Sequence, residues 1–150
     1  MMFADLRFLL RTNSTSIEVR RRARGKEKDA MSSTIEVDLW RGRESGRYER
    51  FEVPAQANQT ILDVVTYIQR NLDPTVAYRF ACRVGVCGSC AMTVNGRPRW
   101  TCRTHVSKVI ENGRIEIGPL ANLPVIKDLA TDMTRFFEKW QEAKGAFTPS

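Results

Sequence analysis

The sequence predicts an α+β fold, in which one helix packs across a small mixed β-sheet and a second helix lies near the C-terminus. Three observations support this prediction. Segments with alternating apolar and polar residues, typical of half-buried strands, begin the body of the chain. A segment with apolar residues at helical spacing follows them. Two Asn-Gly pairs, which favour tight hairpin turns, then separate further strand-like segments.

The first two predicted strands form a hairpin. Residues 33–40 alternate Ile35, Val37 and Leu39 with polar residues, and residues 48–53 supply the second strand. The polar, glycine-containing segment between them, residues 41–47, is typical of a turn. We therefore expect the two strands to pair with each other.

The first predicted helix covers residues 60–72. Its apolar residues recur at helical spacing: Ile61, Val64, Val65, Ile68 and Leu72. Thr60 is a favourable N-cap, and Asp63 follows three residues later as the acid of a short capping box. Pro74 ends the helix, because proline cannot continue the backbone hydrogen bonding.

Four further strand-like segments follow, and they are residues 76–80, 91–94, 106–110 and 114–117. The first would enter a cysteine-rich loop and the second would leave it. Asn95-Gly96 is a strong hairpin signal after the second segment, and Asn112-Gly113 separates the last two. These segments complete the small mixed sheet across which the helix packs.

A second helix is predicted over residues 125–140. One helical face would carry its apolar residues: Ile126, Leu129, Met133, Phe136 or Phe137, and Trp140. Two interpretations of this face remain open. It packs into the core of the domain, or its aromatic residues dock on a partner subunit.

The positive charge of the chain is concentrated near the N-terminus. Of the net charge of +7, residues 1–30 contribute +4 and the remaining 120 residues contribute +3. The body lacks a basic stripe interleaved with aromatic residues, so we do not expect nucleic-acid binding. No stretch of the sequence has the apolar length of a membrane span, and we expect no direct span.

Residues 1–30 are predicted to form a disordered basic extension. Their apolar run precedes their basic run, which is the reverse of a secretory signal, and their four acids disfavour a mitochondrial transit peptide. The extension is either the product of a start codon assigned too early, with Met31 the true start, or a weak targeting segment. We expect a domain over residues 31–142 and a loose tail over residues 143–150.

All four cysteines lie within residues 82–102, with the spacing C-x4-C-x2-C-x11-C. A disulfide framework fits poorly, because such scaffolds spread their cysteines through the chain. A redox dithiol would need only the C-x-x-C pair, Cys87 and Cys90. A Rieske centre needs two histidines, and His105 is the only histidine in the sequence. Structural zinc remains an alternative, although it usually takes two short-spaced pairs.

The spacing of Cys82, Cys87, Cys90 and Cys102 is that of a plant-type 2Fe–2S site. Three cysteines would lie on one loop, and the fourth would approach from the strand beyond the Asn95-Gly96 turn. Thiolates and sulfides are anionic, so the loop must direct backbone N–H groups towards them. Gly85 and Gly88 permit the turns and the close approach that this requires.

The chain resembles the iron–sulfur subunit of succinate dehydrogenase and fumarate reductase. The gap of eleven residues before the fourth cysteine is typical of that family, as are two segments, "LDPTVAYRFACRVGVCGSCAMTVNG" and "PLANLPVIKDLATDMTRFFEKW". The resemblance covers roughly residues 34–140. It implies a β-grasp, ferredoxin-like domain with Cys82, Cys87, Cys90 and Cys102 as ligands of one 2Fe–2S cluster.

The resemblance also implies a role in electron transfer. The cluster would take single electrons from the FAD of a flavoprotein subunit that oxidises succinate or reduces fumarate, a reaction of the tricarboxylic acid cycle. The chain would supply no catalytic residues of its own, and it lacks the glycine-rich motif with which proteins bind FAD or NAD. We expect a cytoplasmic location, peripheral at the inner membrane through partners, or alternatively the mitochondrial matrix.

Several features depart from the family pattern. No cysteine follows Cys102, so we expect any 4Fe–4S and 3Fe–4S clusters on a separate iron–sulfur or membrane-anchor subunit. Residues 99–101 replace a small apolar pair, and Val84 replaces a common acid. Two other functions remain open: a stand-alone ferredoxin that serves another FAD-dependent dehydrogenase, and a zinc-bound interaction module without a redox role.

Overall fold

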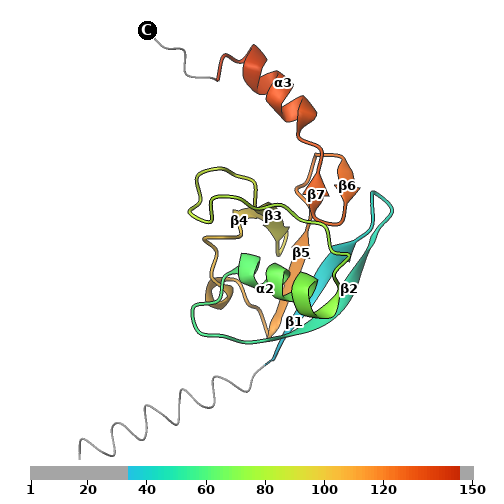
Figure 1. The fold of residues 1–150 in the computed structure, drawn as a ribbon, viewed down its shortest axis with the longest axis vertical. Helices are drawn as coiled ribbons and strands as arrows, with labels where there is room; N and C mark the ends of the chain where they lie inside the picture. The colour runs from blue at the N-terminus through green and yellow to red at the C-terminus, as the bar shows by residue number, and fades with distance from the viewer. Residues whose placement is uncertain (1–33, 146–150) are drawn as a thin grey trace, which may run out of the picture.

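The computed structural model describes residues 34–145 (Figure 1). The predicted basic extension, residues 1–30, and the predicted start of the domain at residue 31 lie outside the described residues. Most of the predicted tail, residues 146–150, also lies outside them. The boundaries of the domain therefore stay predictions.

A five-stranded mixed sheet forms the body of the domain. Its strands are β1 (Thr34–Arg41), β2 (Arg47–Pro54), β3 (Ala91–Val94), β4 (Arg97–Trp100) and β5 (Arg114–Gly118). They are ordered β2-β1-β5-β3-β4, and β1 and β5 are parallel while the other neighbours are antiparallel. This arrangement confirms the predicted α+β fold and the first hairpin.

Helix α2 (Ile61–Tyr67) packs across one face of this sheet, and a single π-helical turn, η1 (Ile68–Leu72), extends it (Figure 1). Thr60 and Asp63 form the predicted capping box. The Asp63 N–H donates to the Thr60 hydroxyl at 3.3 Å, and the Thr60 N–H donates to the Asp63 carboxylate at 3.0 Å. The buried apolar residues of the helix meet those of β1, β3 and β5 in one core.

The Asn95-Gly96 turn joins β3 and β4 as predicted. Both residues have positive φ, 47° and 71°, as a type I′ hairpin turn requires. The Asn95 side chain fixes the turn further, since its amide donates to the Val109 carbonyl at 2.7 Å and its oxygen accepts from the Glu116 N–H at 2.9 Å. The hairpin therefore holds β3 and β4 in a defined register.

Two of the predicted strands are wrong. Residues 76–80 form no strand, because the Ala77 N–H donates to the Asp128 carboxylate and its carbonyl accepts from Leu129. Residues 106–110 contain a short 3-10 helix, η2 (Val106–Lys108), which turns Val106 and Val109 into the core. The Asn112-Gly113 turn is present, but it leads into β5, which pairs with β1 and β3 rather than with residues 106–110.

The predicted helix over residues 125–140 is correct only in its second half. Residues 125–131 form a small hairpin, with β6 (Val125–Lys127) and β7 (Ala130–Thr131), around Asp128 at a φ of 51°. Helix α3 (Thr134–Glu142) follows and has no buried residue. Of the predicted face, Leu129 packs in the core from the hairpin, whereas Phe136, Phe137 and Trp140 are exposed. Packing of the aromatic residues into the core is therefore wrong, and their docking on a partner stays a prediction. Within residues 34–145, neither helix combines the length and apolar character needed to cross a bilayer.

Candidate metal centre

The four cysteines gather at one end of the domain. Cys82, Cys87 and Cys90 lie on the loop between η1 and β3, and Cys102 lies two residues after the end of β4. The prediction that the fourth cysteine comes from the strand itself is thus slightly wrong, because β4 ends at Trp100. Cys90 and Cys102 are buried, Cys82 is half-buried and Cys87 is exposed.

The β3–β4 hairpin brings Cys90 beside Cys102. Ala91 pairs with Trp100 in this hairpin, so the residues just outside the pair remain neighbours. Thr101, which is fully buried, donates from its backbone N–H at 3.3 Å and from its hydroxyl at 2.7 Å to the Cys90 carbonyl. Its own carbonyl accepts from Leu62 at the start of α2. We call these three hydrogen bonds the Thr101 clamp. The sequence analysis missed it, since a single threonine forms no recognisable sequence pattern.

The cysteines are arranged as two neighbouring pairs. Cys90 and Cys102 pack together with Leu62 in one buried cluster, and the Cys87 backbone N–H donates to the Cys82 sulfur at 3.4 Å. Among residues 34–145, no group of three or more His, Cys, Asp and Glu side chains is arranged to hold one metal ion. A tetrahedral zinc site needs four ligands around one ion, whereas a 2Fe–2S cluster takes two ligands on each of two irons. Four thiolates suit either group by donor type, and the C-x4-C-x2-C spacing with a distant fourth cysteine favours the binuclear cluster.

Backbone N–H groups surround the exposed side of the site. The amides of Val84 and Cys87 each donate to the Cys82 sulfur at 3.4 Å, and these bonds lower the pKa of Cys82 to about 6. The Ser89 hydroxyl lowers the pKa of Cys87. Burial, and then the hydrogen bond to Cys90, raise the pKa of Cys102. The loop thus stabilises negative charge on sulfur before any metal binds.

In the metal-free protein, Cys82 is expected to be alkylated by iodoacetamide at lower pH than Cys102. A lowered pKa means that the reactive thiolate of Cys82 forms as the pH rises through about 6, while that of Cys102 forms only above the ordinary range of a thiol. Mass spectrometry of each cysteine peptide across pH measures this order. Alkylation of all four cysteines with one common midpoint would contradict it.

Two glycines give the cysteine loop its shape. Gly85 and Gly88 have φ values of 78° and 73°, in the left-handed region that favours glycine. At Gly85 a Cβ atom would also lie 2.9 Å from the Cγ atom of Arg103, whereas at Gly88 it would meet nothing within 4 Å. Both positions therefore need a residue that tolerates positive φ. Only at Gly85 does a neighbouring side chain, that of Arg103, also lie too close for a Cβ atom.

The Gly85→Ala variant is expected to be less stable than Gly88→Ala. Each change costs about 1–2 kcal/mol for an alanine in the left-handed region. Gly85→Ala adds the displacement of the Arg103 side chain, so its thermal midpoint and its iron content fall further. Gly88→Ala is the matched control, and equal losses in the two variants would show that close approach at Gly85 has no effect.

Arg83 and His105 have roles beside the site. The Arg83 guanidinium lies 3.5 Å from the Asp63 carboxylate and 4.8 Å from the centre of the Phe80 ring. This half-exposed ion pair links the start of the cysteine loop to the first turn of α2. His105 is half-buried and its backbone bridges to Thr60.

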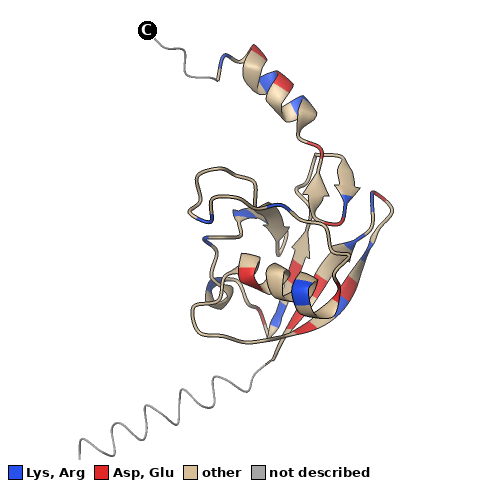
Figure 2. Ribbon diagram, viewed as in Figure 1, with Lys and Arg blue, Asp and Glu red and all other residues tan. Residues whose placement is uncertain are grey.

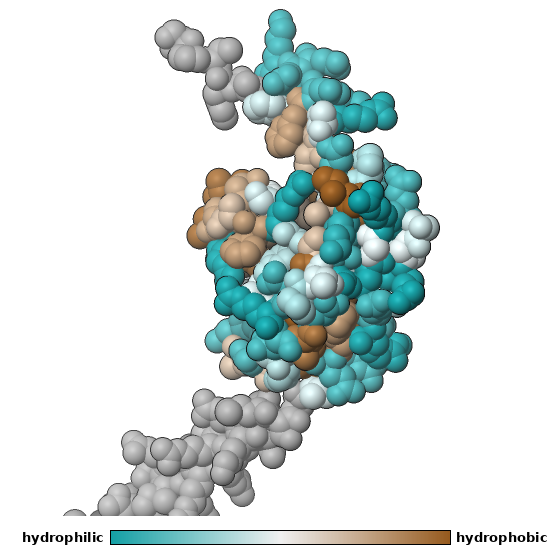
Figure 3. Space-filling view, turned by 45° about the vertical axis from the view of Figure 1, so that its right-hand side comes forward, coloured by the Kyte–Doolittle hydropathy of each residue, from teal (hydrophilic) through white to brown (hydrophobic). Residues whose placement is uncertain are grey.

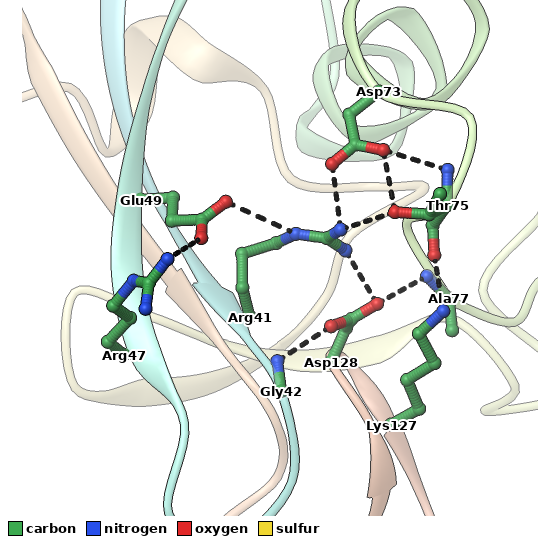
Figure 4. Close-up of polar contacts among 9 residues, drawn as sticks. All are labelled: Arg41, Gly42, Arg47, Glu49, Asp73, Thr75, Ala77, Lys127 and Asp128. Atoms are coloured by element: carbon green, nitrogen blue, oxygen red, sulfur yellow. Dashed lines mark hydrogen bonds and ion pairs between the residues drawn. The ribbon is translucent and has the colours of Figure 1, made fainter.

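A largely buried ion-pair network holds the segment that leads into the cysteine loop (Figure 4). The Arg41 guanidinium, whose side chain is 12% exposed, donates to Asp128 at 2.6 Å, to Asp73 at 2.7 Å and to the Thr75 hydroxyl at 2.6 Å. Asp128, at 1% exposure, also accepts from the backbone N–H groups of Gly42 and Ala77, each at 2.8 Å.

This network joins three distant segments of the chain. Arg41 ends β1, residues 73–77 lead towards the cysteine loop, and Asp128 turns the β6–β7 hairpin. The sequence analysis missed it, because an arginine and an aspartate separated by 87 residues show no local pattern. The network fixes the direction in which the chain enters the cysteine loop.

Comparison with known proteins identifies the family. Residues 18–138 match a family described as "2Fe-2S iron-sulfur cluster binding domain". The chain belongs to this family. The match confirms the predicted 2Fe–2S cluster as the cofactor and supports it over zinc, while the assignment of individual ligands stays a prediction.

Relatives of this 2Fe–2S domain protein include iron–sulfur subunits of fumarate reductase and succinate dehydrogenase. The fumarate reductase subunit of Mycobacterium tuberculosis is 38% identical over 97 residues, 65% of this chain and 39% of that protein. The fumarate reductase subunit of Escherichia coli O157:H7 is 40% identical over 94 residues, which are 63% of this chain and 38% of that protein. The mitochondrial succinate dehydrogenase subunit of Dictyostelium discoideum is 32% identical over 90 residues, 60% and 31%.

A solved structure has the same fold. The match, titled "Mycobacterium smegmatis Sdh1 complex in the apo form", has a TM-score of 0.69 and 33% identity, and covers 78% of this chain and 49% of the matched one. The predicted resemblance to this family of subunits is confirmed. The matched part of this chain spans about a third to two fifths of the length of the curated relatives named above.

Proposed function

We propose that this chain passes single electrons through a 2Fe–2S cluster held by Cys82, Cys87, Cys90 and Cys102, as the iron–sulfur part of a flavoprotein complex. One observation carries the proposal: Cys90 and Cys102 pack together, and the backbone N–H groups of Val84 and Cys87 donate to the Cys82 sulfur on the same loop. When bound, such a cluster accepts and releases one electron at a time. Membership of the 2Fe–2S family supports the cofactor.

The residues of the chain give the two sides of the site different properties. Cys90 and Cys102 are buried, and the Thr101 hydroxyl donates to the Cys90 carbonyl beside them. Cys82 and Cys87 lie on the outward part of the loop, where a partner can approach. Because electron transfer needs a short path, the exposed side is where we place exchange with the partner.

The proposed partner is the FAD-containing subunit of a complex similar to succinate dehydrogenase or fumarate reductase. The names of the relatives support this class. A flavin that gains two electrons from a substrate can pass them singly to a cluster, which is the task of such a subunit. The chemistry of the dicarboxylate then belongs to the flavoprotein, and this chain needs no catalytic residue.

The proposed complex also includes a separate iron–sulfur or membrane-anchor subunit. It would hold this chain at the inner membrane, on the cytoplasmic side in a bacterium or on the matrix side in a mitochondrion. The bacterial and mitochondrial relatives support either setting. Fractionation of membranes with and without high salt measures this peripheral association.

Anaerobic purification of the tagged chain from its native host tests the proposed function. We expect a succinate dehydrogenase-type flavoprotein, identified by mass spectrometry and by its FAD absorbance, to accompany the chain. Addition of succinate to the complex should then reduce the cluster. A flavoprotein that reduces the cluster with a different substrate would replace the succinate assignment, and recovery of the chain without any flavoprotein would overturn the proposal.

A further inference from the structure

The segment that carries the cysteines is the basic part of the described domain. Residues 74–110 contain six basic residues and no acid: Arg79, Arg83, Arg97, Arg99, Arg103 and Lys108. The other described residues carry ten Lys/Arg and thirteen Asp/Glu, a net charge of −3. Figure 2 shows this division, with blue and no red along the projecting loop and on β4. Such an asymmetry attracts a partner of opposite charge.

Large apolar side chains are exposed on the cysteine loop and at the end of β4. Val86 is 84% exposed, Val84 is 61% exposed and Trp100 is 58% exposed. Figure 3 shows brown and tan atoms gathered over the loop that projects on the left. Exposed apolar residues that cluster within a polar rim are typical of surfaces that bind another protein.

These residues form one continuous surface with two of the arginines. A Cβ atom at Gly85 would lie 3.8 Å from the Trp100 ring and 2.9 Å from the Arg103 side chain, so the loop tip rests beside both. Arg99, Trp100 and Arg103 line a hollow of about 550 Å³ next to it. The Arg99 Nε atom is buried and has no hydrogen-bond partner among the described residues. We call Val84, Val86, Arg99, Trp100 and Arg103 the loop face.

We propose that the loop face docks on an acidic surface of the partner flavoprotein, whose carboxylates pair with the arginines around a central apolar contact at Val84 and Val86. This inference rests on the proposed function. A carboxylate in the hollow satisfies the Arg99 guanidinium, and the valines lose water on contact. The exposed Cys87 is next to Val86 in the chain, so docking brings the partner to the outward side of the cysteine pair.

The position of the valines favours a protein over a nucleic acid as the occupant. The phosphates of a nucleic acid would bind the arginines equally well, but they would make no favourable contact with the two exposed valine side chains of the loop. An acidic protein surface with an apolar centre uses both features.

The test uses the holoprotein and the co-purified flavoprotein, with binding measured from low to high salt. We compare Arg99→Glu/Arg103→Glu and Val86→Asp with a matched control, Arg43→Glu/Arg47→Glu. The control makes the same charge change on the exposed β1–β2 turn, away from the loop face. The iron content and the visible spectrum of each variant establish that its cluster is intact.

We expect the loop-face variants to weaken binding at low salt at least about tenfold, and the control to change it little. The difference between the arginine variant and the control should shrink as salt rises, because the screening length falls from about 10 Å at 0.1 M to about 3 Å at 1 M. A photo-crosslinking residue at position 86 should label the flavoprotein, and one at the exposed Tyr48 should not.

Other outcomes separate the two proposals. If the flavoprotein binds the control and the loop-face variants equally, the docking surface is wrong and the proposed function stands. If an acidic protein without flavin binds through the loop face instead, the proposed function is wrong, and the loop face is still a docking surface for an acidic protein. Capture of nucleic acid that nuclease removes, or of no macromolecule at all, would overturn the docking proposal.

Discussion

Replacement of Cys90 by serine is expected to abolish cluster binding. Cys90 is buried, packs against Cys102, and accepts a hydrogen bond from Thr101 through its carbonyl. A serine hydroxyl stays protonated at neutral pH and is a poor ligand for iron compared with a thiolate. We expect the iron content per chain to fall at least about tenfold, with loss of the visible absorption of the cluster.

Two further variants separate ligand loss from loss of packing. Cys87 is exposed, so Cys87→Ser removes a thiolate without leaving a cavity in the core and should also remove the cluster. Ala81→Ser adds a hydroxyl beside Cys82, leaves all four thiols in place and should retain full iron content. A Cys87→Ser protein with an unchanged cluster would show that Cys87 is not a ligand.

The Asp128→Asn variant is expected to be the most destabilised of the single substitutions away from the cysteines. Asp128 accepts hydrogen bonds on both oxygens, from Gly42 on one side and from Arg41 and Ala77 on the other. An amide can accept on one side only, and its NH₂ group then faces a donor. It also leaves the buried Arg41 with only the partly exposed Asp73 and the more distant Glu49 as counter-charges.

The expected loss is about 3 kcal/mol in the free energy of unfolding, at the lower end of the range for breaking a buried ion pair. The thermal midpoint should fall by roughly 10 °C, as calorimetry measures it. Asp132→Asn is the matched control, because the Asp132 oxygen that accepts from Thr134 can be supplied by an amide. A destabilisation of Asp128→Asn no greater than that of Asp132→Asn would mean that the network contributes little.

The elements that local patterns specify were predictable from the sequence. The capping box of Thr60 and Asp63 and the apolar spacing after it are contained within a few residues, and α2 forms as expected. The Asn95-Gly96 turn likewise needs only its own two residues to adopt positive φ. The spacing of the cysteines also predicted which residues the fold brings together, since three of them share one loop.

The elements that depend on distant contacts were not predictable. Residues 125–131 have a helical apolar pattern, yet the buried pairing of Asp128 with Arg41 and with two backbone amides bends them into a hairpin. Asp128 also accepts a hydrogen bond from the Ala77 N–H. This N–H is therefore not available to a neighbouring strand, and residues 76–80 form no strand. The Thr101 clamp depends on the register of β3 and β4, which single residues do not reveal.

The most direct test of the account is electron paramagnetic resonance of the anaerobically purified protein after reduction with dithionite, together with metal analysis. The account predicts iron and acid-labile sulfide in equal amounts and a rhombic spin-half signal at low temperature. Bound zinc with no such signal would contradict it, because the four cysteines would then hold a structural ion and the chain would carry no electron.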